Sequence, residues 1–389
     1  MFPLAQSPQN PRNSSDRDAP QQSASPTHAA ANWLSDPNVF PLAVWLQNPD
    51  NAEKYQQAGI NLFVALYRGP TAEQLAKLQR HGMHAVVSQS QRALQFKDSP
   101  VIVAWMHNDE PDNAQRQRDR GGWGPPVAPE KIVEDYQGMK AADPGRPVLL
   151  NLGQGVAWDG WHGRGVRSNH PEDYPQYIRG CDIASFDIYP ACHEHQDVAG
   201  KIWLVAHGVS RLREWSGGQK RVWNCVETTH INNPNARATP QQVRAEVWMS
   251  IIHGSTGIIY FCHEFKPRFI EAGLLAHEDV LAEVTKVNHQ IQQLAPVLNS
   301  PAIEQGVQVT SSNVGVPVDA MVKHHGGSIY VFAAAMRDGA STGTFKPAGV
   351  PPSGQVEVLG ESRTLQLSDG AFKDDFASWD MHLYRLQAK

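Results

Sequence analysis

The sequence predicts an α/β protein that consists of a (β/α)8 barrel of the TIM type and a small C-terminal antiparallel β-sandwich. Up to about residue 300, eight short apolar runs alternate with longer amphipathic segments, a pattern typical of βα units around a parallel sheet. Eight is the number of strands that closes such a barrel. Beyond residue 300 the apolar stretches become short and alternating, and Gly, Pro and Asp turns separate them, as in antiparallel sheets.

The length of 389 residues allows a barrel of about 250 residues and one smaller domain. We expect a disordered leader over residues 1–32, because its Pro, Ser, Asn, Gln and Ala provide too little apolar surface to offset the entropy of ordering. We expect the barrel over residues 33–299 and the β-sandwich over 300–389. Since the sandwich follows the last barrel helix closely, we expect it to pack on the barrel.

The predicted barrel strands are residues 40–46, 60–66, 84–87, 101–106, 147–152, 182–188, 221–226 and 257–262. Predicted helices with recognisable ends are residues 71–81, 129–142, 240–253 and 277–298. Thr71 and Gln74 make a capping-box pattern at the start of the first of these helices, and Gly82 follows its end. In the sandwich the predicted strands are residues 307–310, 328–333, 355–359 and 381–386.

Two connections are long, at residues 107–128 after the fourth strand and 153–170 after the fifth. In barrels of this kind the loops at the C-terminal ends of the strands form the active site. We therefore expect functional residues in these two loops. Their length favours a pocket or a short cleft over an open groove.

Composition excludes several classes of partner. The net charge is -5 and no basic run is present, so we expect no nucleic-acid partner. No stretch of about 18 apolar residues occurs, so we expect no membrane span. The leader lacks the apolar region of a secretory signal, which favours a secreted or periplasmic protein only if a signal has been removed, and otherwise a cytoplasmic one. The oligomeric state stays open.

The sequence carries no recognisable cofactor or metal motif. The four cysteines show no C-x-x-C or zinc-type spacing, and Cys181 and Cys192 could pair only if the loop between them folds back. A metal enzyme is an alternative suggested by 17 histidines, but no H-E-x-x-H pattern occurs. Neither a G-x-G-x-x-G or Walker pattern after a strand nor a G-x-S-x-G elbow is present. We expect no cofactor and no metal.

Two glutamates stand where a barrel carries its chemistry. The fourth strand runs into Glu110, and the seventh runs into Glu227, so both carboxyl groups are expected at the mouth of the barrel, three strands apart. Hydrolysis of a glycosidic bond needs two carboxyl groups, one that donates a proton to the leaving oxygen and one that attacks or activates water. This pair predicts a glycoside hydrolase acting on a carbohydrate.

The arrangement resembles the clan of retaining (β/α)8 glycoside hydrolases, over roughly residues 40–290. The resemblance implies that Glu110 is the acid/base and Glu227 the nucleophile, and it does not identify a family within the clan. In that clan the acid/base usually follows Asn in an Asn-Glu-Pro motif, whereas here Asp109 precedes Glu110-Pro111. Asn108 or Asp109 would then take over the contact of that Asn with the sugar 2-hydroxyl, or the substrate differs at that carbon.

Other residues resemble the clan's supporting groups. Arg68, after the second strand, resembles the arginine that keeps the nucleophile ionised. Tyr189, after the sixth strand, resembles the tyrosine that donates to the nucleophile. Glu264, after the eighth strand, is a competing candidate for the nucleophile. Indole rings that could support a pyranose are Trp158 and Trp161 in the loop after the fifth strand and Trp45 at the end of the first.

Two further functions remain open at this point. In substrate-assisted cleavage of an N-acetylhexosamine, an adjacent Asp-Glu pair orients the acetamido group and protonates the leaving oxygen, and Asp109-Glu110 fits this pattern. In that case Glu227 would be dispensable. The other alternative is a non-catalytic carbohydrate-binding barrel, against which the presence of both glutamates argues.

Overall fold

The computed structural model describes residues 33–117 and 121–389. The predicted leader over residues 1–32 lies outside the described residues.

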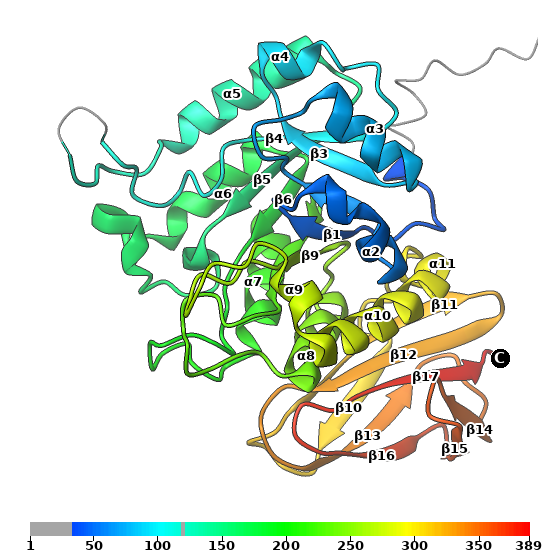
Figure 1. Ribbon diagram of the computed structural model, residues 1–389. Coiled ribbons are helices and arrows are strands. Elements are labelled where there is room, and N and C mark those ends of the chain that lie inside the picture. The colour runs from blue at the N-terminus through cyan, green and yellow to red at the C-terminus, as the bar shows by residue number, and fades with distance from the viewer. Residues whose placement is uncertain (1–32, 118–120) are drawn as a thin grey trace, which may run out of the picture.

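The N-terminal part of the chain forms a closed parallel barrel, as the sequence predicted (Figure 1). The strand order is β7-β6-β5-β4-β3-β2-β1-β9-β8. The seventh barrel strand is divided at Trp223, and its first part pairs with β6 while its second part pairs with β9, which closes the ring. The strands are β1 (Leu42–Trp45), β2 (Leu62–Val64), β3 (His84–Ser88), β4 (Ile102–Met106), β5 (Val148–Leu152), β6 (Ile183–Phe186), β7 (Arg221–Val222), β8 (Asn224–Glu227) and β9 (Ile258–Phe261).

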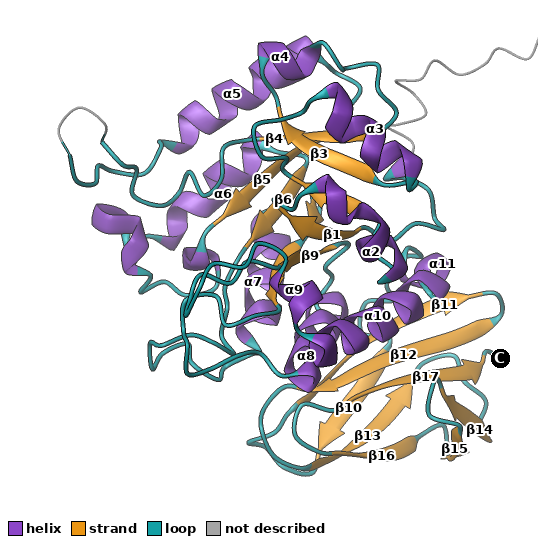
Figure 2. Ribbon diagram, in the orientation of Figure 1, coloured by secondary structure: helices purple, strands orange, loops and turns teal. Residues whose placement is uncertain are grey.

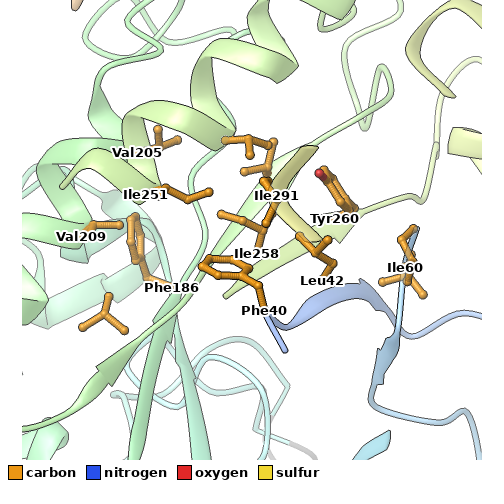
Figure 3. Close-up of a cluster of buried hydrophobic side chains, with 14 of the residues drawn as sticks. Phe40, Leu42, Ile60, Phe186, Val205, Val209, Ile251, Ile258, Tyr260 and Ile291 are labelled. Carbon is orange, nitrogen blue, oxygen red and sulfur yellow. The ribbon is translucent and has the colours of Figure 1, made fainter. Parts of the chain in front are cut away.

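Alternate strand residues face opposite sides of the barrel wall because side chains along a strand alternate in direction. The inward set, which includes Ala43, Leu62 and Cys225, fills the interior of the barrel. The outward set packs against the surrounding helices, as Leu42 and Ile258 do in Figure 3. Burying one branched apolar side chain of this kind contributes about 1.5–3 kcal/mol. The near-continuous apolar strands are therefore explained by burial on both faces.

The helices surround the barrel on its outside (Figure 2). Both predicted ends of the helix after β2 are found. Thr71 and Gln74 form a reciprocal capping box at its start, and His81 caps its end. The predicted helix over 277–298 is instead two helices, because Pro296 cannot continue the backbone hydrogen-bond ladder past Leu294. The helices are α2 (Ala52–Gln57), α3 (Ala72–Arg80), α4 (Gln91–Leu94), α5 (Pro129–Ala142), α6 (Tyr174–Tyr177), α7 (Leu204–Trp215), α8 (Pro240–Ile252), α9 (Gly273–Ala276), α10 (Glu278–Gln293) and α11 (Ala295–Leu298).

The C-terminal part forms two antiparallel sheets with the strand orders β10-β13-β16 and β11-β12-β17-β14-β15. An apolar cluster that includes Val331, Phe345 and Phe372 lies between them, which confirms the predicted sandwich. Its strands are β10 (Val307–Ser311), β11 (Val318–His325), β12 (Ser328–Ala335), β13 (Ser341–Pro347), β14 (Ser353–Val358), β15 (Arg363–Ser368), β16 (Phe372–Phe376) and β17 (Met381–Gln387).

The outer face of the five-stranded sheet packs on the barrel. Trp248 of α8 stacks on Phe332 of β12 with ring centroids 5.8 Å apart, and Met321 and Leu383 belong to the same buried cluster as the barrel helices. Polar contacts surround this apolar centre, such as the His253 to Asp319 pair at 3.1 Å. The sandwich therefore covers α8 (Figure 1).

The described residues bear on three features considered in the sequence: a membrane-spanning helix, a disulfide and a metal site. No helix among residues 33–117 and 121–389 is both long and apolar enough to span a bilayer. All four cysteines are buried and carry free thiols, so Cys181 and Cys192 are not joined. Within the same described ranges, no group of three or more His, Cys, Asp or Glu side chains is arranged to hold a metal ion.

Candidate active site

The backbone turns sharply where β4 ends, and this turn places Glu110 over the barrel. Glu110 has φ +43°, a left-handed conformation that a non-glycine residue rarely adopts. Its N–H donates to the carbonyl of Asn151 at 3.1 Å, and its carbonyl accepts from the N–H of Asn113 at 3.1 Å. Backbone of this kind costs about 1–3 kcal/mol and persists where the surrounding structure enforces it, often at active sites.

Gly153 leaves the space that the Glu110 side chain occupies. A Cβ at this position would lie 3.0 Å from Oε1 of Glu110 and 2.9 Å from the side-chain amide of Asn113. The N–H of Gly153 also donates to the buried Asp112 at 2.9 Å, and Tyr174 donates its hydroxyl to the same carboxylate at 2.9 Å. The loops after β4 and β5 are therefore held together directly beneath Glu110.

Glu110 and Asp187 are two buried carboxyl groups that interact through their charges. Burial, followed by the charges of Asp187 and Asp109, raises the pKa of Glu110 well above its usual range. Burial also raises the pKa of Asp187, while the hydrogen bond from Tyr189 opposes that rise. Tyr189 donates to Oδ2 of Asp187 at 2.9 Å, and Oδ1 has no hydrogen-bond partner among the described residues. The pKa of Glu110 is raised further than that of Asp187, so Glu110 is the more firmly protonated of the two.

Asp109 lies beside this pair and faces the solvent-filled mouth of the barrel. Its side chain is exposed, and it accepts a hydrogen bond from Nδ2 of Asn151 at 3.0 Å. Ser185 donates to the other end of the Asn151 amide at 2.9 Å and so fixes its orientation. The surrounding protein raises the pKa of Asp109 to about 6 through burial, although the Asn151 hydrogen bond lowers it.

Three adjoining cavities surround the acidic residues. One of about 730 Å³ is lined by Asp109, Glu110, Trp123 and Trp161 among others. A second of about 630 Å³ shares Asp109, and a third of about 410 Å³ shares Trp161 and includes Tyr189. Such volumes match those of small-molecule sites. The acidic residues thus lie at the junction of a cleft that extends across the barrel mouth in more than one direction.

Glu227 occupies a different position from the one expected of a nucleophile. Its side chain is 0% exposed, and its two oxygens accept the N–H groups of Ala191 and Cys192 at 2.6 and 2.8 Å. Burial raises the pKa of Glu227 to about 6, and the charge of Glu227 contributes to a raised pKa of the buried Glu246 of α8. Glu227 lines none of the three cavities. It anchors the loop after β6 because both oxygens are committed to that loop.

The residues expected to support the nucleophile do not approach Glu227. Arg68 is exposed, and its guanidinium lies 5.1 Å from the ring centre of Tyr67. Tyr189 donates to Asp187, as described above, and not to Glu227. Glu264, the competing candidate for the nucleophile, is buried in a hydrogen bond with His277 at 2.7 Å and lines none of the three cavities.

The predicted aromatic residues and Asn108 lie at different depths. Trp161 lines two of the cavities and donates its Nε1–H to Asn113 at 2.8 Å. Trp45 lines the 630 Å³ cavity from the interior of the barrel. Trp158 lines none of the three and packs against Trp161, with centroids 5.9 Å apart. Asn108 is exposed and also lines none of them.

Sequence reasoning missed two residues of this site. Asp187 stands two positions before Tyr189 at the end of the sixth strand, the same kind of position that singled out Glu110, so it could have been found by the same rule. Asn151 lies within a strand that reads as wholly apolar otherwise. A single polar residue in such a strand is a usable signal, because a buried amide requires partners.

No protein-family model matches the sequence, and a search of curated proteins finds no match. Among solved structures, the chain is similar to a catalytic mutant of Gan42B, a GH42 β-galactosidase from G. stearothermophilus, with 8% identity, a TM-score of 0.57 and coverage of 90% of this chain and 98% of that chain. It is also similar to an α-amylase from Geobacillus thermoleovorans complexed with acarbose, with 9% identity, a TM-score of 0.56 and coverage of 92% and 99%.

A maltogenic α-amylase, AmyB from Thermotoga neapolitana, is similar at 8% identity and a TM-score of 0.53, with coverage of 91% of this chain and 100% of that chain. At such identities the likeness concerns the fold. The resemblance to (β/α)8 glycoside hydrolases is therefore confirmed for the arrangement of barrel and C-terminal β domain, and the family within them is not identified.

Proposed function

We propose that this protein is a glycoside hydrolase in which Glu110 donates a proton to the glycosidic oxygen. The observation that carries this proposal is the position of Glu110, which lines the 730 Å³ cavity at the mouth of the barrel with a carboxyl group whose pKa burial and the charge of Asp187 raise. A glycosidase needs such a neutral acid beside an ionised carboxylate. The fold shared with a β-galactosidase and two α-amylases supports the same class of reaction.

The groups around Glu110 suit both proton donation and the binding of a sugar ring. Burial first, and then the charge of Asp187, favours the protonated form of Glu110, and general acid catalysis by such a group contributes about 10²–10⁴-fold to a rate. Trp161 and Trp123 provide flat faces in the same cavity, against which the C–H side of a pyranose packs. The substrate class proposed is therefore a carbohydrate with an O-glycosidic bond.

The proposal is tested by screening the full-length protein against aryl glycosides and polysaccharides, alongside Glu110→Gln. Turnover by the wild type that falls about 10²–10⁴-fold in Glu110→Gln supports it. Saturable sugar binding without any turnover by the wild type would support a non-catalytic carbohydrate-binding barrel instead.

The second carboxylate of the reaction distinguishes two candidate mechanisms. The sequence predicts double displacement with Glu227 as the nucleophile, which requires a Glu227 oxygen to leave its amide donors and reach the cleft. Substrate-assisted cleavage requires only Glu110 and an adjacent carboxylate that contacts the 2-acetamido group. Asp109 lines two of the cavities with an exposed carboxylate, and this observation favours the substrate-assisted candidate.

Paired aryl glycosides separate the two mechanisms. A substrate-assisted enzyme cleaves 2-acetamido glycosides and leaves the matching 2-hydroxy glycosides intact, and its turnover survives Glu227→Gln in the fraction of protein that stays folded. A double-displacement enzyme cleaves the 2-hydroxy glycosides and loses turnover in Glu227→Gln. Both mechanisms retain the anomeric configuration, so an inverted first product by NMR would contradict both.

A further inference from the structure

A row of aromatic rings leads from the acidic pair to the rim of the barrel. Tyr189, which donates to Asp187, lies 5.0 Å from Phe261 between ring centroids, and Phe261 lies 5.3 Å from His263. His263 is followed by Phe265 at 5.9 Å and Phe269 at 6.1 Å, with interplanar angles of 11° and 23°. The rings therefore share nearly one orientation at the rim and continue inward to the site of the proposed chemistry.

The outer rings belong to a loop that is held in place from both sides. Glu264 and Ile270 exchange backbone hydrogen bonds of 2.9 and 2.8 Å and so close the loop between them. Within it, the N–H of Phe265 donates to the carbonyl of Ile231 at 2.7 Å. The Glu264 side chain is paired with His277 at 2.7 Å. The loop thus presents its phenyl rings from a fixed base, although Phe269 is 63% exposed.

One wall of the 630 Å³ cavity is formed by Phe261, His263, Phe265 and Phe269. Trp45 and Tyr67 also line this cavity. The carboxamides that line it are already engaged. Gln47 donates to the carbonyl of Glu271 at 2.9 Å, and Gln74 donates to the carbonyl of Tyr67 at 3.0 Å. Asn48 caps its own turn by accepting the N–H of Asp50 at 3.0 Å. A pyranose would find few free amide groups there to bind its several hydroxyls.

One residue of the wall has an unpartnered polar atom beneath the surface. His263 lines the cavity and is 6% exposed, and its buried Nδ1 has no hydrogen-bond partner among the described residues. A buried polar atom without a partner is uncommon and suggests an absent ligand group. The carboxylates of Asp109 and Glu271 also line the cavity, so an anionic occupant is disfavoured.

From this arrangement we propose that the 630 Å³ cavity binds an uncharged aromatic ring of the substrate, such as the phenolic group of an aryl glycoside. The ring packs against Phe265 and Phe269, and a hydroxyl or ether oxygen at its edge lies beside the imidazole of His263. The assignment of this ring to the substrate rests on the proposed glycosidase function, whereas binding of the ring itself does not.

Binding is measured first, on the full-length protein, by saturation-transfer NMR with phenol as the probe and the methyl glucosides and galactosides of both anomers for comparison. We expect saturable phenol binding that weakens about three- to tenfold in Phe269→Ala. Val314→Ala, which removes a 96% exposed side chain of the sandwich, is expected to leave phenol binding unchanged. Trp123→Ala, in the neighbouring cavity, is also expected to leave it unchanged.

Two results would overturn the proposal. One is phenol binding that is undetectable or equally strong in Phe269→Ala and Val314→Ala. The other is a protein that binds the methyl glycosides but not phenol, and that loses methyl glycoside binding in Phe269→Ala. The cavity would then be a pyranose site. A protein that binds phenol through Phe269 but hydrolyses no glycoside would instead contradict the proposed function and leave the aromatic site standing.

Discussion

At the scale of single residues, the buried carboxyl groups of Glu110 and Asp187 and the strained backbone of Glu110 all lower the stability of the fold. Glu110 combines a positive φ with a pKa raised by burial and by the charge of Asp187, and Asp109 precedes it in the chain. Burial of like-charged acids raises their pKa values and lowers the unfolding free energy at neutral pH. Residues that lower stability in this way are typical of functional sites.

Glu110→Gln tests this conflict between stability and function. The amide cannot ionise, so we expect the thermal unfolding midpoint at pH 8 to rise or stay level while turnover falls about 10²–10⁴-fold. Calorimetry and a hydrolysis assay on the same preparation provide the two values. A large loss of stability without a comparable loss of turnover would assign Glu110 a structural role.

Gly153→Ala is expected to disturb the site without removing any functional group. The new Cβ would lie 3.0 Å from Oε1 of Glu110, so the carboxyl must shift, and a displacement of about 1 Å lowers turnover about a hundredfold. Gly138→Ala in α5 is the matched control, because no atom lies within 4 Å of its added Cβ and an exposed helical glycine gains about 0.5–1 kcal/mol on this change. Equal turnover in the two variants would show that Gly153 does not position Glu110.

At the scale of elements, β8, α8 and the loop after β6 meet at a buried acidic pair. Glu227 accepts the N–H groups of Ala191 and Cys192, and neither carboxyl oxygen of Glu246 has a hydrogen-bond partner among the described residues. Burial first, and then the Glu227 charge, raises the pKa of Glu246 well above its usual range. We therefore expect the two groups to hold a shared proton where a strand, a helix and a loop meet.

This pair predicts a pH dependence of stability. The folded pKa of Glu227 is about 6 and that of Glu246 is higher still, whereas unfolded glutamates titrate near 4.5, so the folded state binds more protons above pH 4.5. Its unfolding free energy must then fall as the pH rises through and beyond 6. In Glu246→Gln the amide takes up no proton, and this part of the fall should disappear.

The measurement is urea unfolding at pH 4 and pH 8. We expect Glu246→Gln to match the wild type at pH 4 and to exceed it at pH 8. Glu134→Gln on the exposed face of α5 serves as the control and should follow the wild type at both values. A variant that is less stable than the wild type at pH 8 would show that the two carboxyl groups do not share a proton.

The burial of each strand decided whether the sequence could predict it. The eight barrel strands are recognisable because they are buried on both faces and read as continuous apolar runs. In the sandwich, the strands β11, β13, β15 and β16 were not predicted. In β13 and β16, the sequences STGTFKP and FKDDF place only alternate or terminal side chains in the core. The direction of Glu227 could not be predicted, since sequence places a residue at a strand end without showing which groups its side chain meets.

At the scale of the whole molecule, the sandwich completes the apolar surface of the barrel. Phe332, Met336 and Met381 belong to the same buried cluster as the residues of α7, α8 and α10. The two parts therefore bury one another's apolar faces, and we expect them to unfold together.

Phe332→Ala tests this coupling. Removing the ring from its stack on Trp248 leaves a cavity between the two parts, and we expect the unfolding free energy to fall by about 3–5 kcal/mol. Val314→Ala, at an exposed site of the same sandwich, should change it by less than about 0.5 kcal/mol. Two separate calorimetric transitions in the wild type would contradict the shared core.

The central claim is that Glu110 is the proton donor, and the dependence of rate on the leaving group tests it most directly. The wild type and Glu110→Gln are compared on aryl glycosides of the sugar that the wild type cleaves, with leaving-group pKa values from about 4 to about 10. We predict that Glu110→Gln loses about 10²–10⁴-fold on the poorest leaving groups and little on the best, because a good leaving group departs without a proton. An equal loss across the whole series, or no loss at all, would contradict the assignment of Glu110 as the acid.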